Sequence, residues 1–266
     1  MAVISKELLK SVSPIGIKDN TNKICWCATC FFVASKNIKI DTYDLPFLVT
    51  NKHVIKNQKT IVIRTKSKGI TDYSDYEISL YDGDKPLYFV HDCSDVDLVV
   101  LPLSIEFLKI EYDFSCYDID LFSLSTEELL QQGGSIGTFI SMLGYPLGLV
   151  SNESQTPICR LGCIARIDKT EIQKDHYYII DIQNFPGNSG SPVLVRPELS
   201  YLAGTNNITQ TNLIGVVYEY ITYNVQLLNL QSNRVEEIRS ENSGLAKVIP
   251  VEYIRDIIYS HYPIKK

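Results

Sequence analysis

The chain has 266 residues, of which 45% are hydrophobic and 21% are charged. These proportions are typical of a folded globular protein and exclude a disordered one. The net charge of -6 and the pI near 5.3 argue against nucleic acid and anionic membranes as partners, because both bind basic surfaces. All-β domains of this length are common, so a single domain is possible.

The N-terminus predicts a short helix and not a targeting signal. Residues 1–10 carry charges within an amphipathic pattern and lack the uninterrupted apolar core of a signal peptide. No stretch reaches the roughly 18 consecutive apolar residues of a membrane helix. Seven cysteines, an odd number without a secretory signal, favour reduced thiols and a cytoplasmic location.

Two groups of cysteines could be half-sites for zinc. Cys25, Cys27 and Cys30 form one group, and Cys159 and Cys163 form the other. Both groups lie in strand-like runs without the turn residues of a zinc knuckle. Buried free thiols are the preferred interpretation, and we expect neither a metal nor another cofactor.

Strand patterns dominate the chain from residue 24 onward, separated by turn sequences such as 81–84 and 132–134. Helical periodicity is confined to residues 1–10, 126–132 and 251–258. This count of short strands predicts an all-β barrel or sandwich. The predicted strands are residues 24–34, 45–50, 60–65, 76–80, 87–91, 97–103, 136–144, 158–167, 177–182, 193–195, 213–223 and 245–248.

A polar segment, residues 119–134, divides these strands into two sets of about six. We therefore expect one domain over residues 1–266, with residues 1–118 as the N-terminal helix and first half. Residues 135–266 form the second half and the C-terminal helix. The polar segments 197–212 and 224–242 are expected to be surface loops that a regulatory protein could bind.

Ser189 lies between two predicted strands, in a turn rich in Pro, Gly and Asn. Gly187 and Gly190 flank it and allow backbone conformations that a side chain would forbid. Successive N–H groups can then converge beside the hydroxyl. A nucleophilic oxygen next to donors for an oxyanion is what acyl transfer requires.

His53 and two aspartates precede this turn in the chain. His53 follows an apolar run at the start of a probable helical turn. Asp97 stands directly before a run of apolar residues, where a carboxylate is desolvated on one side and can hold an imidazole. Asp95 is two residues away and would face the same side of a strand, so it remains an alternative.

These motifs resemble those of the trypsin-like (chymotrypsin-fold) serine peptidases. Residues 187–192 fit G-[DN]-S-G-[GS]-P at every position, residues 50–54 fit T-x-x-H-V, and residues 97–101 fit D-[LIV]-[AV]-[LV]-[LIV]. The chain looks most similar to the compact prokaryotic branch that includes HtrA/Deg protease domains, without their PDZ module. The order His, Asp, Ser is that of the chymotrypsin type.

The resemblance implies two six-stranded antiparallel β-barrels with the site between them and a C-terminal helix. It also implies a serine endopeptidase that works through an acyl-enzyme. His53 would be the general base, Asp97 would orient it, and Ser189 would attack the peptide carbonyl. Gly187, Asn188 and Ser189 would form the oxyanion hole, with the N–H groups of Gly187 and Ser189 as donors.

Substrate binding is expected at Gln183 and on the strand that holds Tyr218, Glu219 and Tyr220. A neutral amide at Gln183 argues against an ion pair with a basic substrate, so we expect a small or medium uncharged P1 residue. Asn188 replaces an aspartate that many relatives pair with a newly cleaved N-terminus. We therefore expect no activation by N-terminal cleavage.

Two other functions compete with peptide hydrolysis. One is a catalytically silent trypsin-like domain used as a binding scaffold, and the other is an esterase with the same triad. The oligomeric state is open. The remaining histidines, His91, His176 and His261, have no counterpart in the motifs and are expected to be structural or surface residues.

Overall fold

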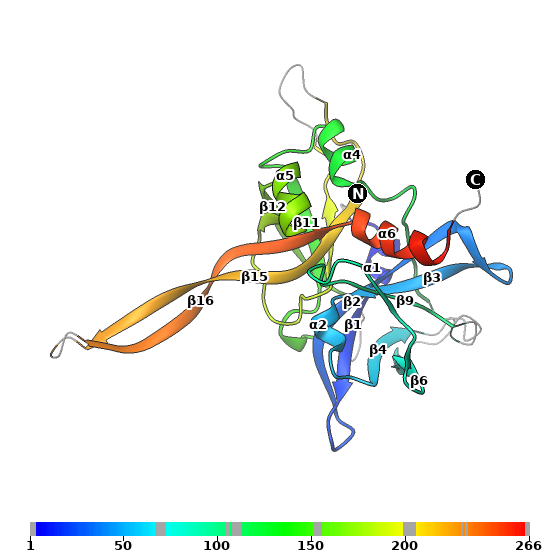
Figure 1. Cartoon of the computed structure of the whole chain (residues 1–266), viewed down its shortest axis with the longest axis horizontal. Coiled ribbons are helices and arrows are strands. Elements are labelled where there is room, and N and C mark those ends of the chain that lie inside the picture. Colours follow the sequence, from blue (N-terminus) through cyan, green and yellow to red (C-terminus); the bar gives the residue numbers. More distant parts are fainter. Residues whose placement is uncertain are drawn as a thin grey trace.

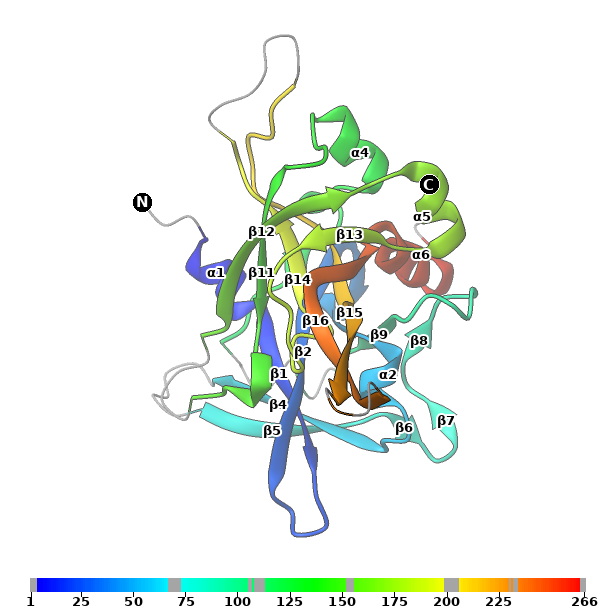
Figure 2. The ribbon, with the colours of Figure 1, turned by 90° about the vertical axis from the view of Figure 1, so that its left-hand side faces the viewer.

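Alternating apolar residues form two β-sheet units that lie one above the other, with helices on the outside (Figures 1 and 2). The computed structural model describes residues 4–66, 73–104, 107, 113–151, 156–198, 206–229, 231 and 234–263. Within these residues, no helix is long and apolar enough to cross a membrane.

The first unit is an eight-stranded sheet in the order β5-β4-β1-β2-β3-β9-β8, with β10 parallel to β2. β2 is 17 residues long and is shared, pairing with β1 over its first part and with β3 over its second. A separate hairpin joins β6 and β7. The strands are β1 Val12–Lys18, β2 Ile24–Ile40, β3 Tyr43–Thr50, β4 Thr60–Lys66, β5 Tyr73–Ser79, β6 Tyr81–Asp82, β7 Lys85–Pro86, β8 Phe89–Val90, β9 Val99–Pro102 and β10 Tyr117–Asp118.

The second unit is a closed barrel in the order β11-β12-β13-β16-β15-β14. Its strands pair antiparallel throughout, and bulges bend β12, β14 and β15. The strands are β11 Phe139–Gly144, β12 Ile158–Arg166, β13 Tyr178–Asp181, β14 Pro192–Val195, β15 Asn212–Asn229 and β16 Arg234–Pro250.

The buried side chains form three apolar cores, one in each unit and one between the units. One fills the first unit around Phe32 and Ile63, and another fills the second barrel around Ile164 and Val193. The third lies between the units and beneath the C-terminal helix, and it includes Phe31 from β2. Because this core joins residues from both halves, it fixes their relative position.

Among the described residues, six short helical segments surround the sheets. In α4, Ser125 and Glu128 form a reciprocal capping box, and Glu128 also pairs with Arg255 of α6 at 3.0 Å. α6 buries Ile254, Ile257 and Ile258 against the core between the units. The segments are α1 Lys6–Lys10, α2 Lys52–Ile55, α4 Thr126–Gln131, η1 Pro146–Gly148, α5 Lys169–Asp175 and α6 Glu252–His261.

The prediction of an all-β fold with two barrels and a C-terminal helix is confirmed. The first barrel differs in detail, since short strands bring its described sheet to eight. The predictions missed β1, which contains Pro14 and Gly16, and α5, which buries only Ile172. The division at residues 119–134 stays a prediction.

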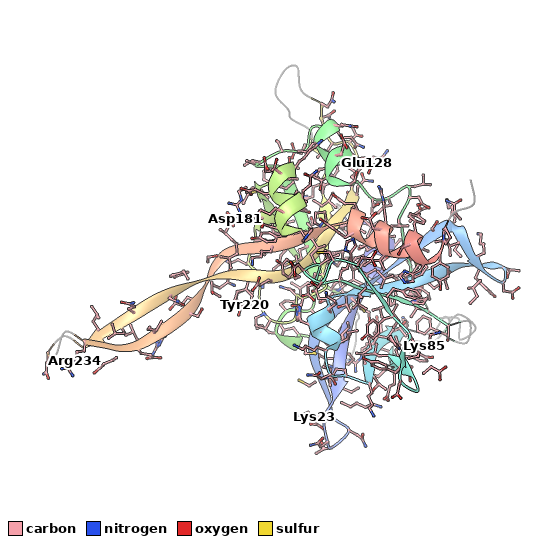
Figure 3. The ribbon with its side chains drawn as sticks, viewed as in Figure 1. Lys23, Lys85, Glu128, Asp181, Tyr220 and Arg234 are labelled. Atoms are coloured by element: carbon pink, nitrogen blue, oxygen red, sulfur yellow. The ribbon has the colours of Figure 1, made fainter. Side chains whose placement is uncertain are left out.

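The expectation that residues 224–242 form a surface loop is wrong. The described residues of this segment belong to a long β15–β16 hairpin, here called the arm, that projects from the second barrel (Figure 1). Figure 3 shows Tyr220 near its base and Arg234 near its outer end. Pairing continues from Thr222 opposite Asn242 to Asn229 opposite Arg234. The other expected loop, 197–212, is irregular where described, but residues 199–205 lie outside the described residues.

Candidate active site

His53 and Asp97 meet because neighbouring strands deliver them. β3 ends at Thr50, and His53 follows in α2, whose Val54 and Ile55 are buried in the first core. Thr50 pairs with Val99 of β9, directly after the segment that carries Asp97. The two strand ends therefore bring the imidazole and the carboxylate to one place.

Two hydrogen bonds join Asp97 to His53. The ring Nδ1 of His53 lies 2.5 Å from Asp97 Oδ2, and the backbone N–H of His53 donates to Asp97 Oδ1 at 3.0 Å. Asn51 Nδ2 donates to the Asp97 carbonyl at 2.9 Å and holds the backbone there. The side chain of Asp97 is 21% exposed and that of His53 is 46% exposed. The carboxylate is thus sheltered while the imidazole reaches solvent.

Opposing effects set the pKa of Asp97. Burial acts to raise the pKa, but the hydrogen bonds and charge of His53, with a contribution from Lys52, outweigh it and lower the pKa below its usual value. Asp97 therefore stays ionised and favours a positive charge on the imidazole. Asp95, the alternative, is exposed and accepts a hydrogen bond from Ser94 Oγ at 3.2 Å. Among the described residues it makes no hydrogen bond or ion pair with His53.

Ser189 is held by its backbone in the connection between β13 and β14. Its carbonyl accepts from Thr29 N at 2.9 Å, and Thr29 Oγ1 donates to the Gly187 carbonyl at 2.8 Å. Gly190 N donates to Val217 O at 2.9 Å. Thr29 lies on β2 of the first unit and Val217 on β15 of the second. The Ser189 turn is therefore hydrogen-bonded to both units.

Two glycines make this turn possible. Gly190 has φ +84°, and a Cβ there would lie 2.1 Å from the Thr29 carbonyl oxygen. Gly187 has φ +99°, and a Cβ there would lie 2.5 Å from the Tyr145 carbonyl oxygen. Positive φ and close backbone approach both require glycine at these positions.

The peptide before Gly187 is oriented by a hydrogen bond. Leu147 N donates to the Pro186 carbonyl at 2.6 Å. In a trans peptide the N–H points opposite to the C=O, so Gly187 N–H points away from Leu147. Gly187 and Ser189 N–H have no acceptor among the described residues, whereas Asn188 N–H donates to Phe185 O at 3.1 Å. The two N–H groups expected to bind an oxyanion, those of Gly187 and Ser189, are therefore available to a ligand.

No hydrogen bond joins Ser189 Oγ to the His53 ring in the described part of the chain; the ring is bonded at Nδ1 to Asp97. Catalytic hydrogen bonds are often long in the free enzyme and tighten when substrate binds. The structure thus brings His53 and Asp97 into contact and holds Ser189 separately.

The expected substrate-binding residues lie in two places, on the segment after β13 and on β15. Gln183 is exposed just after β13. Tyr218 is half-buried, and burial together with the neighbouring Glu219 raises its pKa. Glu219 pairs with Lys247 at 2.6 Å, and Tyr220 is half-buried. The charge of Glu219 is therefore balanced within the strand pair.

A hollow of about 490 Å³ opens beside His53 and Asp97. Tyr81, Tyr88 and Val90 line it together with residues of α2. The two tyrosine hydroxyls are 3.0 Å apart, and this hydrogen bond raises the pKa of Tyr88 to about 12. The Tyr88 hydroxyl therefore stays protonated near neutral pH.

Sequence reasoning missed Thr29 and Leu147, which position the Ser189 turn. Thr29 is fully buried, and its hydroxyl also accepts from Tyr145 N at 3.0 Å. A polar residue inside the apolar run 28–33 is a signal that could have marked it, because a buried hydroxyl needs partners. Leu147 carried no such signal, since its role depends on a backbone φ of +57°.

One of the comparisons with known proteins identifies a family. The model of the trypsin-like peptidase domain matches residues 28–197, more than half of the chain. No curated protein matches the chain significantly.

Solved structures with a similar backbone are distant in sequence. The apo MamO protease domain from Magnetospirillum magneticum is 12% identical with a TM-score of 0.47, covering 94% of this chain and 97% of that one. A scabies mite inactivated protease paralogue is 13% identical with a TM-score of 0.48, at 95% and 96% coverage. HL collagenase is 14% identical with a TM-score of 0.49, at 98% and 96% coverage. On the strength of the family match, the chain belongs to the trypsin-like peptidase domain family.

Proposed function

We propose that this protein is a serine endopeptidase whose triad is His53, Asp97 and Ser189. The observation that carries the proposal is the contact of His53 with Asp97 in a molecule whose Ser189 turn also leaves two N–H groups without acceptors. One half supplies a base with a fixed orientation, and the other supplies a nucleophile beside an anion site. Together they meet the needs of acyl transfer.

The reaction follows from these positions. The hydrogen bond from Nδ1–H to Asp97 leaves Nε2 of His53 free to accept the Ser189 proton as Oγ attacks the peptide carbonyl. Gly187 N–H and Ser189 N–H then bind the oxyanion. His53 gives the proton to the leaving amine. In the second stage His53 takes a proton from water, the water attacks the acyl group, and the proton returns to Ser189 Oγ as the acid product leaves. Asp97 stays ionised throughout and stabilises the imidazolium.

Substrate selection is proposed to depend on Gln183 and on the β15 segment with Tyr218, Glu219 and Tyr220. Lys247 balances Glu219, so this wall offers no free carboxylate to a basic side chain. A small or medium uncharged P1 residue fits best. A peptide library profiled with the purified protein tests this, and a preference for Arg or Lys at P1 would contradict it.

We also propose that activity does not await N-terminal cleavage. Asn188 is buried with neither side-chain polar atom hydrogen-bonded among the described residues, and its neutral amide cannot form the ion pair that such activation uses. Removing residues 1–20 should therefore not raise activity. A full-length protein that gains activity only on this removal would overturn the idea. All seven cysteines are free thiols, which fits a cytoplasmic location.

One rival has an observation in its favour. The missing hydrogen bond between Ser189 and His53 would suit a silent scaffold that binds peptides without cutting them. Such a protein would bind a peptide and return it intact, as mass spectrometry of the peptide after incubation would show.

A fluorophosphonate probe tests the proposal in one gel. Wild-type protein should be labelled, and Ser189→Ala should not. Ser191→Ala is the matched control, because Ser191 is only two residues away but fully buried, and it should keep its labelling. Labelling that survives Ser189→Ala, or an unlabelled wild type that is folded, would contradict the assignment.

A further inference from the structure

Outside the triad, the side chains of Cys93 and Tyr253 meet at the imidazole ring of His176. Cys93 Sγ, in the loop between β8 and β9, lies 3.3 Å from His176 Nε2. His176 Nδ1 lies 2.9 Å from the hydroxyl of Tyr253 in α6. Both ring nitrogens of His176 are therefore engaged, one by a thiol and one by a phenol.

His176 has a left-handed backbone conformation at the end of α5. It ends α5 with φ +63° and ψ +19°, and its N–H donates to the Ile172 carbonyl at 2.8 Å. A left-handed backbone at a residue other than glycine is uncommon and is worth a functional explanation. Its ring also meets the Tyr253 ring edge-on, with centroids 5.7 Å apart. The imidazole is thus fixed between the second barrel, the C-terminal helix and the loop of Cys93.

The hydrogen bonds suit an imidazole that takes up a proton. Burial, followed by the charges of Glu252 and Asp256, raises the pKa of Tyr253 to about 12, so its hydroxyl stays protonated. That hydroxyl can donate to Nδ1 or accept from it. When Nε2 takes the thiol proton, Nδ1–H donates to the Tyr253 oxygen. Nucleophile, base and orienting group therefore stand in the order that activates a nucleophile.

We propose that Cys93 is a second nucleophile, a thiol that His176 activates for exchange with a low-molecular-weight disulfide. His176 accepts the Cys93 proton while the sulfur attacks one sulfur of the disulfide. A new S–S bond forms on Cys93, the old one breaks, and the leaving thiolate takes the proton from His176. Cys93 is oxidised, and one half of the small disulfide is reduced to a thiol.

The other thiols lack this arrangement. Burial raises the pKa of Cys116 to about 12 and that of Cys27 to about 11, so both resist ionisation. Cys163 is partly buried like Cys93, but its thiol makes no hydrogen bond in the part of the chain that is described. Cys163 is therefore the matched control, a thiol of similar exposure that has no histidine beside it to act as a base.

The position of Cys93 connects this site to the proposed triad. Cys93 O accepts from Val96 N at 3.3 Å, and Lys52 Nζ, next to His53, donates to Ser94 O at 2.6 Å. A bulky group on Cys93 would separate this loop from His176 and displace the segment that leads to Asp97. If the proposed function holds, mixed-disulfide formation at Cys93 lowers hydrolysis reversibly.

The test follows mixed-disulfide formation at each cysteine by mass spectrometry after addition of oxidised glutathione. Cys93 should react at least about tenfold faster than Cys163, and His176→Asn should slow Cys93 by about 100-fold without changing Cys163. Asn is chosen because it tolerates the left-handed conformation. Tyr253→Phe, which keeps the ring but removes the hydroxyl, should slow Cys93 several-fold.

Equal rates at Cys93 and Cys163, or a Cys93 rate that both folded variants leave unchanged, would overturn the proposal. The labelling needs no peptidase activity, so it also works in Ser189→Ala. In a separate arm, glutathionylation should reduce peptide hydrolysis by wild type but not by Cys93→Ser, and dithiothreitol should restore it. Labelling of Cys93 without loss of hydrolysis would contradict the link to the triad and leave the thiol site standing.

Discussion

The two halves of the candidate active site are built in different ways. The half from the first unit consists of side chains, with Asp97 and His53 joined by two hydrogen bonds at 2.5 and 3.0 Å. The half from the second unit consists of backbone, with Ser189 held through carbonyls, N–H groups and two glycines at positive φ. The first half depends on charge and responds to pH, whereas the second depends on close packing.

This difference determines how each half should fail. Removing a charge from the first half leaves its shape intact and changes proton transfer. Adding a methyl group to the second half leaves every catalytic side chain in place and changes the shape. Thr29 lies between them, because it is a first-unit residue that holds the Ser189 turn.

The largest effect is expected from Asp97→Asn. The amide keeps the shape but favours the wrong tautomer of His53, and kcat should fall by about 10⁴-fold. Asp95→Asn is the matched control and should lower kcat by less than about tenfold, because Asp95 is exposed. Steady-state kinetics with both variants, each checked by thermal melting, test this. A near-normal Asp97→Asn beside an inactive Asp95→Asn would reverse the assignment.

Gly190→Ala should break the other half. Its Cβ would meet the Thr29 carbonyl at 2.1 Å, and backbone atoms cannot move aside as a flexible side chain can. We expect a loss of roughly 3 kcal/mol in unfolding free energy, from positive φ and overpacking together. Hydrolysis should fall by at least about 100-fold, because a misplaced nucleophile costs about that much.

Gly244→Ala separates the cost of a positive φ from the cost of overpacking. Gly244 has φ +83°, but a Cβ there would meet nothing within 4 Å. Denaturant unfolding should therefore show a loss of only about 1 kcal/mol, the conformational part alone. If both alanine variants lose the same stability, the packing argument for the Ser189 turn is wrong.

Thr29→Val should have an intermediate effect. It removes the donor to Gly187 O and the acceptor for Tyr145 N, and so deletes two hydrogen bonds at a fully buried side chain. We expect a loss of about 1–3 kcal/mol in unfolding free energy. Thr29→Ser keeps the hydroxyl and should recover most of the lost unfolding free energy. A serine variant as impaired as valine would show that the methyl group, and not the hydroxyl, positions the turn.

The smallest effect is the pH dependence of stability. Because the folded pKa of Asp97 is lowered, its contribution is complete above the unfolded value of about 3.9 and is lost as pH falls through the folded value. Unfolding free energies of wild type and Asp97→Asn should therefore differ by a constant amount above about pH 5 and converge below about pH 4. A difference that grows as pH falls would contradict the sign of this pKa shift.

The sequence was informative where local pattern decides structure. Ser189 stands in a turn whose glycines are visible in the chain, and Asp97 precedes an apolar strand, so both could be predicted. The outer part of the arm could not, because its Asn, Gln and Ser residues have low strand propensity and bulges interrupt the alternation. Its pairing is set by the hairpin itself and not by a buried face.

Contacts between distant segments also escaped prediction. Cys93 and His176 are 83 residues apart, and nothing near either residue signals the other. His176 was expected to be structural or at the surface, because it has no counterpart in the motifs. Its left-handed backbone depends on how α5 ends. Likewise, the role of Thr29 depends on β2 approaching the Ser189 turn from the other unit.

The central claim is that the two halves act on one bond as a unit. The direct measurement is the residual kcat of Ser189→Ala, of Asp97→Asn and of the double variant on one peptide substrate. Members of a triad are strongly non-additive, so the double variant should be no slower than Ser189→Ala alone, within about threefold. If instead the two losses multiply, the halves act independently, and the account of a single triad is contradicted.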